Sequence, residues 1–539
     1  MELARVFLLG ALFLIAFMLW NAWQNEYPNT QALKTPTPVV EKQVAAAMRK
    51  LPDAQIDEGQ KSQGQRFVHV KTDVLDVLID TQGGNIVQAN LLSYPERANE
   101  ANSPPFQLLS NSPDSYYVSQ SGIVGSDKPV LQYKSAQINY NLGADQSELA
   151  VNLLCTSCGN IAIQKQFVFK RGDYQVPINY QINNHSDSLW KGQLYTQFQQ
   201  KKRVSPHSLF NISSYIGGAI STQEKPYQKV SFDKMGEGIA MATENGWVAM
   251  LQHYFISAWV PPAGPYHFYS YGKDNIYTLG MLGNPFQIEP GAQYTSQAKL
   301  YLGPESLDRL KAVAPHLDLT VDYGILWFIS MALFWLLKHI YQVVGNWGWS
   351  IVIVTVLIKL AFYHLSAKSY RSMAAMRNLQ PRLNALKERY ADDRQKLTQA
   401  TMELYKAEKV NPLGGCLPIL VQIPVFIALY WMLLESVELR QAPFIFWIHD
   451  LSTKDPYYIL PILMGISMFV QQRLNPPPPD PTQAKVMQFL PILFTALFLN
   501  FPSGLVLYWV VNNTLSILQQ WYIMRRMEQQ FNQKNLKKR

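Results

Sequence analysis

The sequence predicts an all-β domain joined to a membrane-embedded α-helical bundle. Its 539 residues exceed one ordinary domain, and a hydrophobic content of 48% with a mean hydropathy of −0.08 suits a chain that is part membrane and part soluble. From Arg66 to Leu302, short stretches alternate apolar and polar residues between turn signals. From Ile325 onward, apolar stretches of membrane-spanning length recur. We therefore expect a β-sandwich and six transmembrane helices, five of which form the bundle core.

The first 65 residues predict a membrane anchor and a tether. The run Val6–Trp20 is apolar and follows Arg5, but no A-x-A-like cleavage site comes after it, so residues 1–23 read as an uncleaved signal anchor. Residues 24–65 are polar and include Thr35-Pro36-Thr37-Pro38, which is typical of a flexible tether.

Residues 66–322 predict the β-sandwich domain. Ile161–Lys170 is one of several stretches in which apolar and polar residues alternate, as in a half-buried strand. The domain also contains Cys155 and Cys158, whose spacing fits a local disulfide, a redox pair or half of a zinc site. No second CxxC exists, which excludes a four-cysteine zinc site, and a redox motif would need a βαβ context. A structural disulfide or two free thiols are the favoured interpretations.

The rest of the chain predicts helices. Residues 323–344 end in a polar half with Lys338, His339 and Gln342, which favours an amphipathic helix lying in the membrane interface. Residues 345–365 hold the second span, 366–416 a cytoplasmic helical hairpin, 417–524 spans three to six, and 525–539 a basic cytoplasmic tail. The five spans expected after the anchor are Trp347–Leu365, Leu417–Leu434, Tyr457–Val470, Val486–Leu499 and Gly504–Met524.

Charge supports this topology. The formal net charge is +9, yet residues 21–322 hold 24 basic and 26 acidic residues. The segment 366–416 holds ten basic and five acidic residues, and 525–539 holds six basic and one acidic, so both belong in the cytoplasm. The loop 435–456, with two basic and four acidic residues, belongs outside. This pattern places the β domain on the outer side of the membrane only if the 323–344 helix does not span the membrane.

Lys359 is the most informative residue. It lies in the apolar run Trp347–Tyr363, where an ionisable side chain usually faces a protein interior or a wet cavity. The alternative is that Lys359 snorkels to the headgroups from one end of its span. No Asp or Glu lies within the five C-terminal spans, so we favour a hydrated cavity open to the cytoplasm. Other candidate groove residues are Thr355, Gln422, Tyr508, Trp509, Asn513 and Ser516, although such polar side chains also serve as interhelical hydrogen-bonding groups.

The segment 366–416 carries a second pattern. Met373, Met376 and Leu379 recur at helical spacing, which predicts an amphipathic hairpin. With Arg377 and Arg382, this face would form a docking surface for a partner or an emerging polypeptide, or would merely connect spans. Its basic charge could also contact rRNA, but no RNA-binding motif is present.

Catalytic motifs are missing from the sequence. It has no HExxH, GxSxG or P-loop, which argues against an enzyme or a primary pump, and we expect no cofactor and no metal. A transporter or channel would usually show internal repeats, and none is visible. A membrane-anchored carbohydrate-active enzyme would need a carboxylate pair in the β domain, and no spacing singles one out.

Four stretches carry a resemblance to a known family. The C-terminal region resembles the YidC membrane protein insertase family over roughly residues 320–530, and the anchor and β domain match its Gram-negative form less specifically. The stretches are Tyr405–Pro424, Val437–Phe444, Asp455–Gly465 and Phe501–Trp509.

The resemblance implies a function and a site. Five core spans would enclose a hydrophilic groove open to the cytoplasm and to lipid, in which Lys359 takes the place of a family arginine and Trp509 that of a substrate-contacting tyrosine. Thr355 matches a family threonine. The β domain would be β-supersandwich-like. The implied protein is an inner-membrane insertase and chaperone acting on nascent membrane proteins, alone or with the Sec translocon, and with the ribosome, the signal recognition particle machinery and membrane lipids as partners, but no DNA. The alternative is an assembly scaffold without a translocation path.

Overall fold

The computed structural model describes two compact units. The β unit ends at Asp322 and the helical unit begins at Tyr323. The expected anchor, nearly all of the tether and the end of the hairpin lie outside the described residues. The described residues are 51–52, 66–97, 102–125, 131–202, 215–390, 393–408, 410, 417–475 and 481–536.

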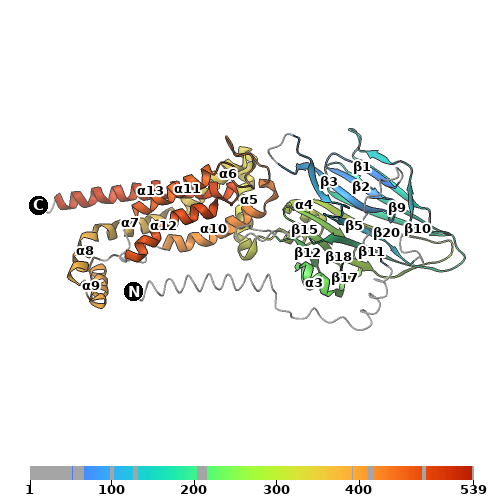
Figure 1. The fold of residues 1–539 in the computed structure, drawn as a ribbon, viewed down its shortest axis with the longest axis horizontal. Coiled ribbons are helices and arrows are strands. Elements are labelled where there is room, and N and C mark those ends of the chain that lie inside the picture. The colour runs from blue at the N-terminus through green and yellow to red at the C-terminus, as the bar shows by residue number, and fades with distance from the viewer. Residues whose placement is uncertain are drawn as a thin grey trace. The chain divides into compact units, whose positions relative to one another are not determined.

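The β unit contains two sheets with a core between them (Figure 1). Its β-rich character is confirmed. The first sheet has the order β14-β17-β18-β11-β5-β3-β2-β1-β7, with β19 on β11 and β4 on β3. Its strands are β1 Phe67–Lys71, β2 Leu75–Asp80, β3 Asn85–Pro95, β4 Pro105–Leu109, β5 Tyr117–Val124, β7 Asn139–Asn141, β11 Trp190–Lys201, β14 Ile239–Glu244, β17 Pro265–Lys273, β18 Ile276–Gly283 and β19 Phe286–Ile288.

The second sheet has the order β13-β12-β15-β16-β20-β10-β9-β8-β6. Its strands are β6 Tyr133–Ser135, β8 Glu148–Cys155, β9 Ile161–Lys170, β10 Gln175–Asn184, β12 Gly217–Ser221, β13 Gln228–Val230, β15 Trp247–Gln252, β16 Phe255–Val260 and β20 Gln293–Pro304. Two short helices, α3 (Phe232–Glu237) and α4 (Leu307–Val313), complete the unit.

Alternating side chains build the core between the sheets. In β9, alternate residues beginning at Ile161 are buried, and this face includes Phe167. Phe198 of β11 meets Trp259 of β16 across the interface, with ring centroids 6.2 Å apart. At the end of β8, Cys155 is joined to Cys158 by a disulfide, which closes the turn into β9.

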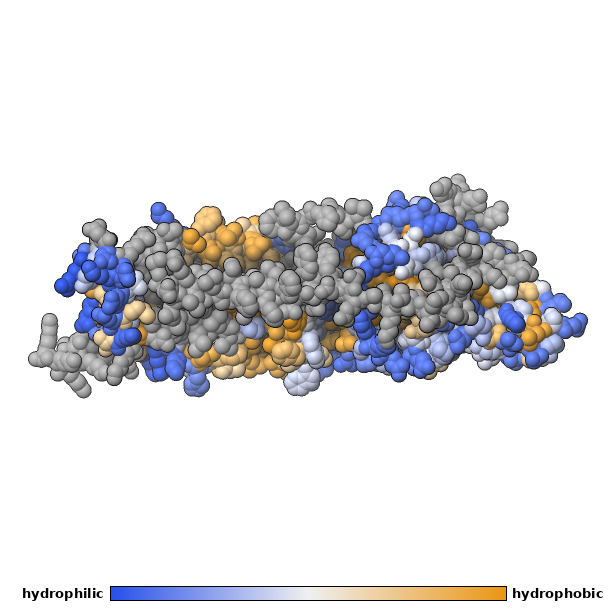
Figure 2. Space-filling model, turned by 90° about the horizontal axis from the view of Figure 1, so that it is seen from below, coloured by the Kyte–Doolittle hydropathy of each residue, from blue (hydrophilic) through white to orange (hydrophobic). Residues whose placement is uncertain are grey.

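The helical unit consists of apolar helices and one polar hairpin. Its helices are α5 Trp327–Val344, α6 Trp347–Ala361, α7 Tyr363–Asn378, α8 Gln380–Arg389, α9 Arg394–Ala407, α10 Leu417–Glu435, α11 Ile459–Leu474, α12 Pro481–Phe498 and α13 Ser503–Leu536. Short 3-10 turns occur at Gly324–Leu326 and Val437–Leu439, and a further one at Leu317–Thr320 belongs to the β unit. Figure 2 shows hydrophobic residues gathered on the surface of this unit, and exposed examples include Phe328, Trp335, Ile466, Phe489 and Ile492. Such a surface is suited to lipid rather than to water.

Several helix boundaries differ from the sequence expectation. The expected span Trp347–Leu365 is divided into α6 and α7, which meet at 67° beside Phe362. No Pro or Gly lies near this bend, and nothing in the local sequence explains it. The segment expected to be the sixth span continues as a single helix to Leu536, so the first part of the basic tail is helical.

Length and apolarity single out few helices. Among the described residues, Gly324–Val344 alone is an unbroken helix both long and apolar enough to cross a membrane, and the bent pair α6–α7 passes the same test when counted together. The apolar helical parts Gln422–Glu435, Ile459–Leu474 and Lys485–Phe498 are shorter. Helix 324–344 is thus present as expected.

Candidate functional site

Lys359 lies at the centre of the candidate site. Its Nζ donates a hydrogen bond of 2.7 Å from α6 to Ser516 Oγ on α13. Ser516 Oγ in turn donates to the carbonyl oxygen of Asn512, one turn earlier. Among the described side chains, no carboxylate forms an ion pair with Lys359. The ammonium group is therefore held by a neutral hydroxyl, and none of these carboxylates neutralises its charge.

A third helix joins this arrangement. Gln422 of α10 donates a 2.6 Å hydrogen bond to Asn512 Oδ1, so Asn512 and Ser516 connect α13 to both α10 and α6. We call Lys359, Gln422, Asn512 and Ser516 the polar cluster. A hollow of about 10 Å³ adjoins it, which is room for about one water molecule. The hollow is lined by Ile358, Lys359, Phe362, Leu365, Ser366 and Gln422.

The other expected groove residues point elsewhere. Thr355 is 1% exposed and donates to the carbonyl of Ile351 in its own helix, so the structure gives it a role within α6. Asn513 turns away from the polar cluster and donates to Ser467 of α11. Such i−4 and interhelical bonds are how membrane helices satisfy polar side chains.

Aromatic side chains surround Trp509. Its ring lies 4.5 Å from that of Phe426 and 5.1 Å from that of Phe498, measured between centroids. The indole Nε1 of Trp509 is buried and has no hydrogen-bond partner among the described residues. A buried donor without a partner is uncommon, so this group is a candidate for contact with a bound polypeptide.

Sequence reasoning missed some partners. Asn512, Ser467 and Asn475 complete interhelical hydrogen bonds with Gln422, Asn513 and Gln520 respectively. The i, i+4 spacing of Asn512 and Ser516 could have indicated that both lie on one face of α13. Residues on different helices could not be paired without the packing.

The hairpin residues are only partly brought together. Met373 packs against the buried cluster of Ala367, Tyr370 and Ile523, which holds α7 against the C-terminal half of α13. Leu379 is buried, whereas Arg377 is exposed. Arg382 forms an ion pair with Glu408, which links the start of α8 to the end of α9.

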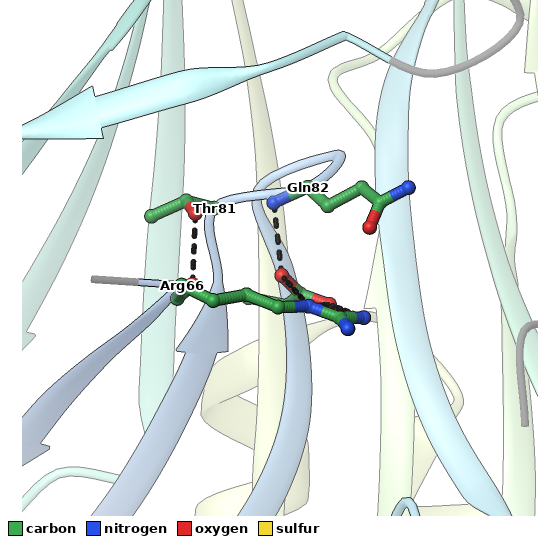
Figure 3. Close-up of polar contacts among 4 residues, drawn as sticks. Arg66, Thr81 and Gln82 are labelled. Carbon is green, nitrogen blue, oxygen red and sulfur yellow. Dashed lines mark hydrogen bonds and ion pairs between the residues drawn. The ribbon is translucent and has the colours of Figure 1, made fainter. Parts of the chain in front are cut away.

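The β unit contains a cavity of about 40 Å³. Figure 3 shows the polar contacts on its wall, where Arg66 donates to the carboxylate of Asp80 at 2.9 Å and Gln82 N donates to Asp80 Oδ1 at 2.9 Å. Asp80 is the only carboxylate among the residues that line this cavity. A glycosidase needs two carboxyl groups flanking its substrate, so the lining residues do not make such a site.

Comparison with known proteins identifies the family. The family model described as 60Kd inner membrane protein matches residues 339–530, and the one described as YidC periplasmic domain matches residues 67–336. Proteins named membrane protein insertase YidC are 53% identical over 542 residues in Legionella pneumophila (strain Corby) and 48% identical over 554 residues in Coxiella burnetii (strain Dugway 5J108-111). In both cases the match covers 98% of this chain and 97% of the relative.

A relative of the same name from Stutzerimonas stutzeri (strain A1501) is 47% identical over 557 residues, covering 98% of this chain and 99% of the relative. A solved structure of an active YidC insertase with its first transmembrane domain resolved aligns over 90% of this chain and 99% of its own, at 17% identity and a TM-score of 0.39. On the strength of the near full-length matches at about half identity, the chain belongs to the YidC family of membrane protein insertases.

Proposed function

We propose that this chain inserts hydrophobic segments of nascent membrane proteins into the inner membrane along a groove centred on the polar cluster. The observation that carries the proposal is the Lys359 cation, which lies in an apolar helix, hydrogen-bonds to Ser516 and has no ion-pair partner among the described residues. A charge in such surroundings is costly, and ionisable residues placed there usually serve a function. An acidic residue in the translocated part of a substrate would compensate it.

The mechanism is physical, and the chain needs no catalytic group for it. A polar segment that crosses hydrocarbon leaves its backbone and side-chain groups without hydrogen-bond partners, at several kcal/mol for each group. Water and the polar cluster would supply partners part of the way, which shortens the distance crossed without them. The apolar helix of the substrate would meanwhile move along α6 and α13 into lipid.

The proposed topology follows the charges. Residues 323–344 lie in the interface, six spans cross the membrane, and the hairpin and the C-terminus lie in the cytoplasm. The hairpin, with Arg377 and Arg382, would face the ribosome and the signal recognition particle machinery, and the spans would meet the Sec translocon. The exposed apolar side chains of α11 and α12 support contact between these helices and lipid.

Site-specific photo-crosslinking to a stalled nascent membrane protein tests the groove. Probes at Lys359 and Trp509 should crosslink to the nascent chain in a manner that depends on its length. A probe at Ile492, which is 62% exposed on α12, is the control and should crosslink to lipid alone.

Crosslinks from the hairpin without any from Lys359 or Trp509 would favour the second candidate, an assembly scaffold without a translocation path. The polar contacts between the helices would then be structural, as the hydrogen bond between Asn513 and Ser467 already is.

A further inference from the structure

The loop between α10 and α11 is held in place by hydrogen bonds to two buried carboxylates. We call residues Glu438–Tyr458 the cap loop. Two buried carboxylates organise it: Asp450 accepts hydrogen bonds from the backbone N–H groups of Gln441 and Ser452, and Asp455 accepts from Trp447 Nε1 at 3.0 Å. Asp455 also accepts from the backbone N–H of Leu460 at the start of α11. Charge-assisted bonds of this kind fix a loop more firmly than neutral ones.

The cap loop also holds the first turns of two helices. Asn346, which caps α6, donates to the carbonyl of Phe444, and the Phe444 ring covers Gly348 so closely that an added Cβ would overlap it. At the other helix, Ser503 N donates to the carbonyl of Thr453 at 2.7 Å. The loop thus joins α6 and α13, the same helices that carry Lys359 and Ser516.

Phe446 stands out on this loop. Its side chain is 82% exposed, although its ring stacks at 6.0 Å on that of Trp447. Its backbone has φ +54°, in the left-handed region that a bulky side chain rarely adopts. Strained backbone held by its surroundings is often associated with function. The contact with Trp447 leaves most of the Phe446 ring exposed, so its apolar surface is available for a contact outside the chain.

Neighbouring residues indicate the nature of that partner. Ile445 and Tyr457 are also exposed, so Phe446 belongs to an apolar and aromatic patch. The cap loop connects the apolar helices α10 and α11. Helix α11 exposes Ile462 and Ile466 within its first turns. A loop that connects two lipid-facing helices begins and ends at the membrane surface, where aromatic side chains are enriched.

We propose that Phe446, with Ile445 and Tyr457, is a lipid anchor that enters the boundary between headgroups and acyl chains beside the cap loop. This inference rests on the proposed topology. Because the loop is bonded to α6 and α13, the anchor would fix the depth of these helix ends relative to the membrane surface. The groove could then open only at the end away from the cap loop.

Spin-label depth measurements test the anchor in the full chain. A label would be placed at F446C in a Cys416→Ser background, reconstituted in vesicles of phosphatidylethanolamine and phosphatidylglycerol, with Cys155 and Cys158 left oxidised. Matched labels at H449C, exposed on the same loop, and at I466C, 55% exposed on α11, serve as water and lipid references.

The label at residue 446 should collide with dissolved oxygen several-fold more often, relative to a water-soluble nickel chelate, than the label at residue 449. If residue 446 matches residue 449 while residue 466 reports lipid, the anchor is wrong and the topology stands. Water contact at residue 466 would overturn the topology and the anchor with it. Dipolar broadening at residue 446 would show contact with a second copy and would also overturn the lipid anchor.

Discussion

At the scale of single residues, Lys359 is an ionisable side chain whose hydrogen-bond partner, the Ser516 hydroxyl, is neutral. Its ammonium group is compact and has three donors, of which the hydrogen bond to Ser516 uses one. The remaining donors can bind a carboxylate of a passing segment. An arginine would keep the charge with a different geometry, whereas a methionine would remove the charge at a similar volume.

Lys359→Met should therefore impair insertion of substrates whose translocated segments contain Asp, by about tenfold, since a hydrogen bond to a charged group contributes about 1.5–3 kcal/mol. Lys359→Arg should retain most of the activity. The measurement is protease protection of paired substrates that differ only in Asp→Asn changes. An equal loss for both members of each pair would contradict the charge argument.

Lys165 is a fully buried lysine in the core of the β unit. Its side chain is 0% exposed, and Nζ donates to the carbonyl oxygens of Gly84 and Ser121 on the opposite sheet. Burial lowers the pKa of Lys165 well below its ordinary value of 10.5. Between the folded and the unfolded pKa, the unfolded chain binds the extra proton, so the free energy of unfolding rises with pH in that window.

Lys165→Met removes this dependence. The difference in unfolding free energy between the parent chain and the variant should rise with pH, with a slope of up to about 1.4 kcal/mol per pH unit, and level off above about 10.5. The buried tyrosines, such as Tyr133, whose pKa burial raises, titrate in both proteins and cancel in the difference. Denaturant titrations at several pH values provide the measurement, and a difference independent of pH would refute the assignment.

At the scale of elements, close packing between α11 and α12 depends on Gly465. A Cβ added there would overlap Thr495 Oγ1, whose own hydrogen bond to the carbonyl of Pro491 holds it in place. Small residues let membrane helices approach in this way. Gly465→Ala should lower the unfolding free energy of the helical unit by about 1–3 kcal/mol, as overpacking does.

The double variant Gly465→Ala with Thr495→Ala gives the control. It removes the obstructing oxygen and should recover most of the lost stability, measured by thermal unfolding in detergent. If the double variant is no more stable than Gly465→Ala alone, the loss of stability arises within α11 and not from contact with Thr495.

Some features of the elements follow from the sequence and others do not. The apolar runs of α10 and α11 indicate contact with lipid or a protein core. They predict helices because a segment in lipid must satisfy its own backbone hydrogen bonds. The bend at Phe362 cannot be predicted from the sequence, because no Pro or Gly lies near it. The polar cluster could be predicted in part, because a lysine within an apolar run is recognisable from the sequence. The hydrogen bond between Gln422 and Asn512 could not, because it depends on how α10 packs against α13.

At the scale of the whole molecule, the order of strands in the two sheets could not be predicted from the sequence. Alternation in β9 predicts a half-buried strand. In contrast, β5 is buried along its whole length despite its Ser and Gln residues, because it lies in the middle of a sheet beside β11. That neighbour is about 70 residues away in sequence, and no local pattern reports a pairing such as Gln120 with Gln197.

The charge distribution, by contrast, makes a prediction for the whole chain that one experiment can check. The hairpin and the tail hold the basic excess, so both should face the cytoplasm, and the nearly neutral β unit should face the periplasm. In a Cys416→Ser background, single cysteines at two exposed positions, Asp145→Cys in the β unit and Arg377→Cys in the hairpin, report the two sides.

A membrane-impermeant maleimide added to spheroplasts should label the cysteine at position 145 and spare the one at position 377 until detergent is added. Labelling of both positions before detergent would place the hairpin outside. The helix at 324–344 would then have to cross the membrane together with five further spans, and the orientation assigned to the Lys359 groove would be reversed. The positive-inside rule opposes that arrangement, since it would export ten basic residues of the segment 366–416.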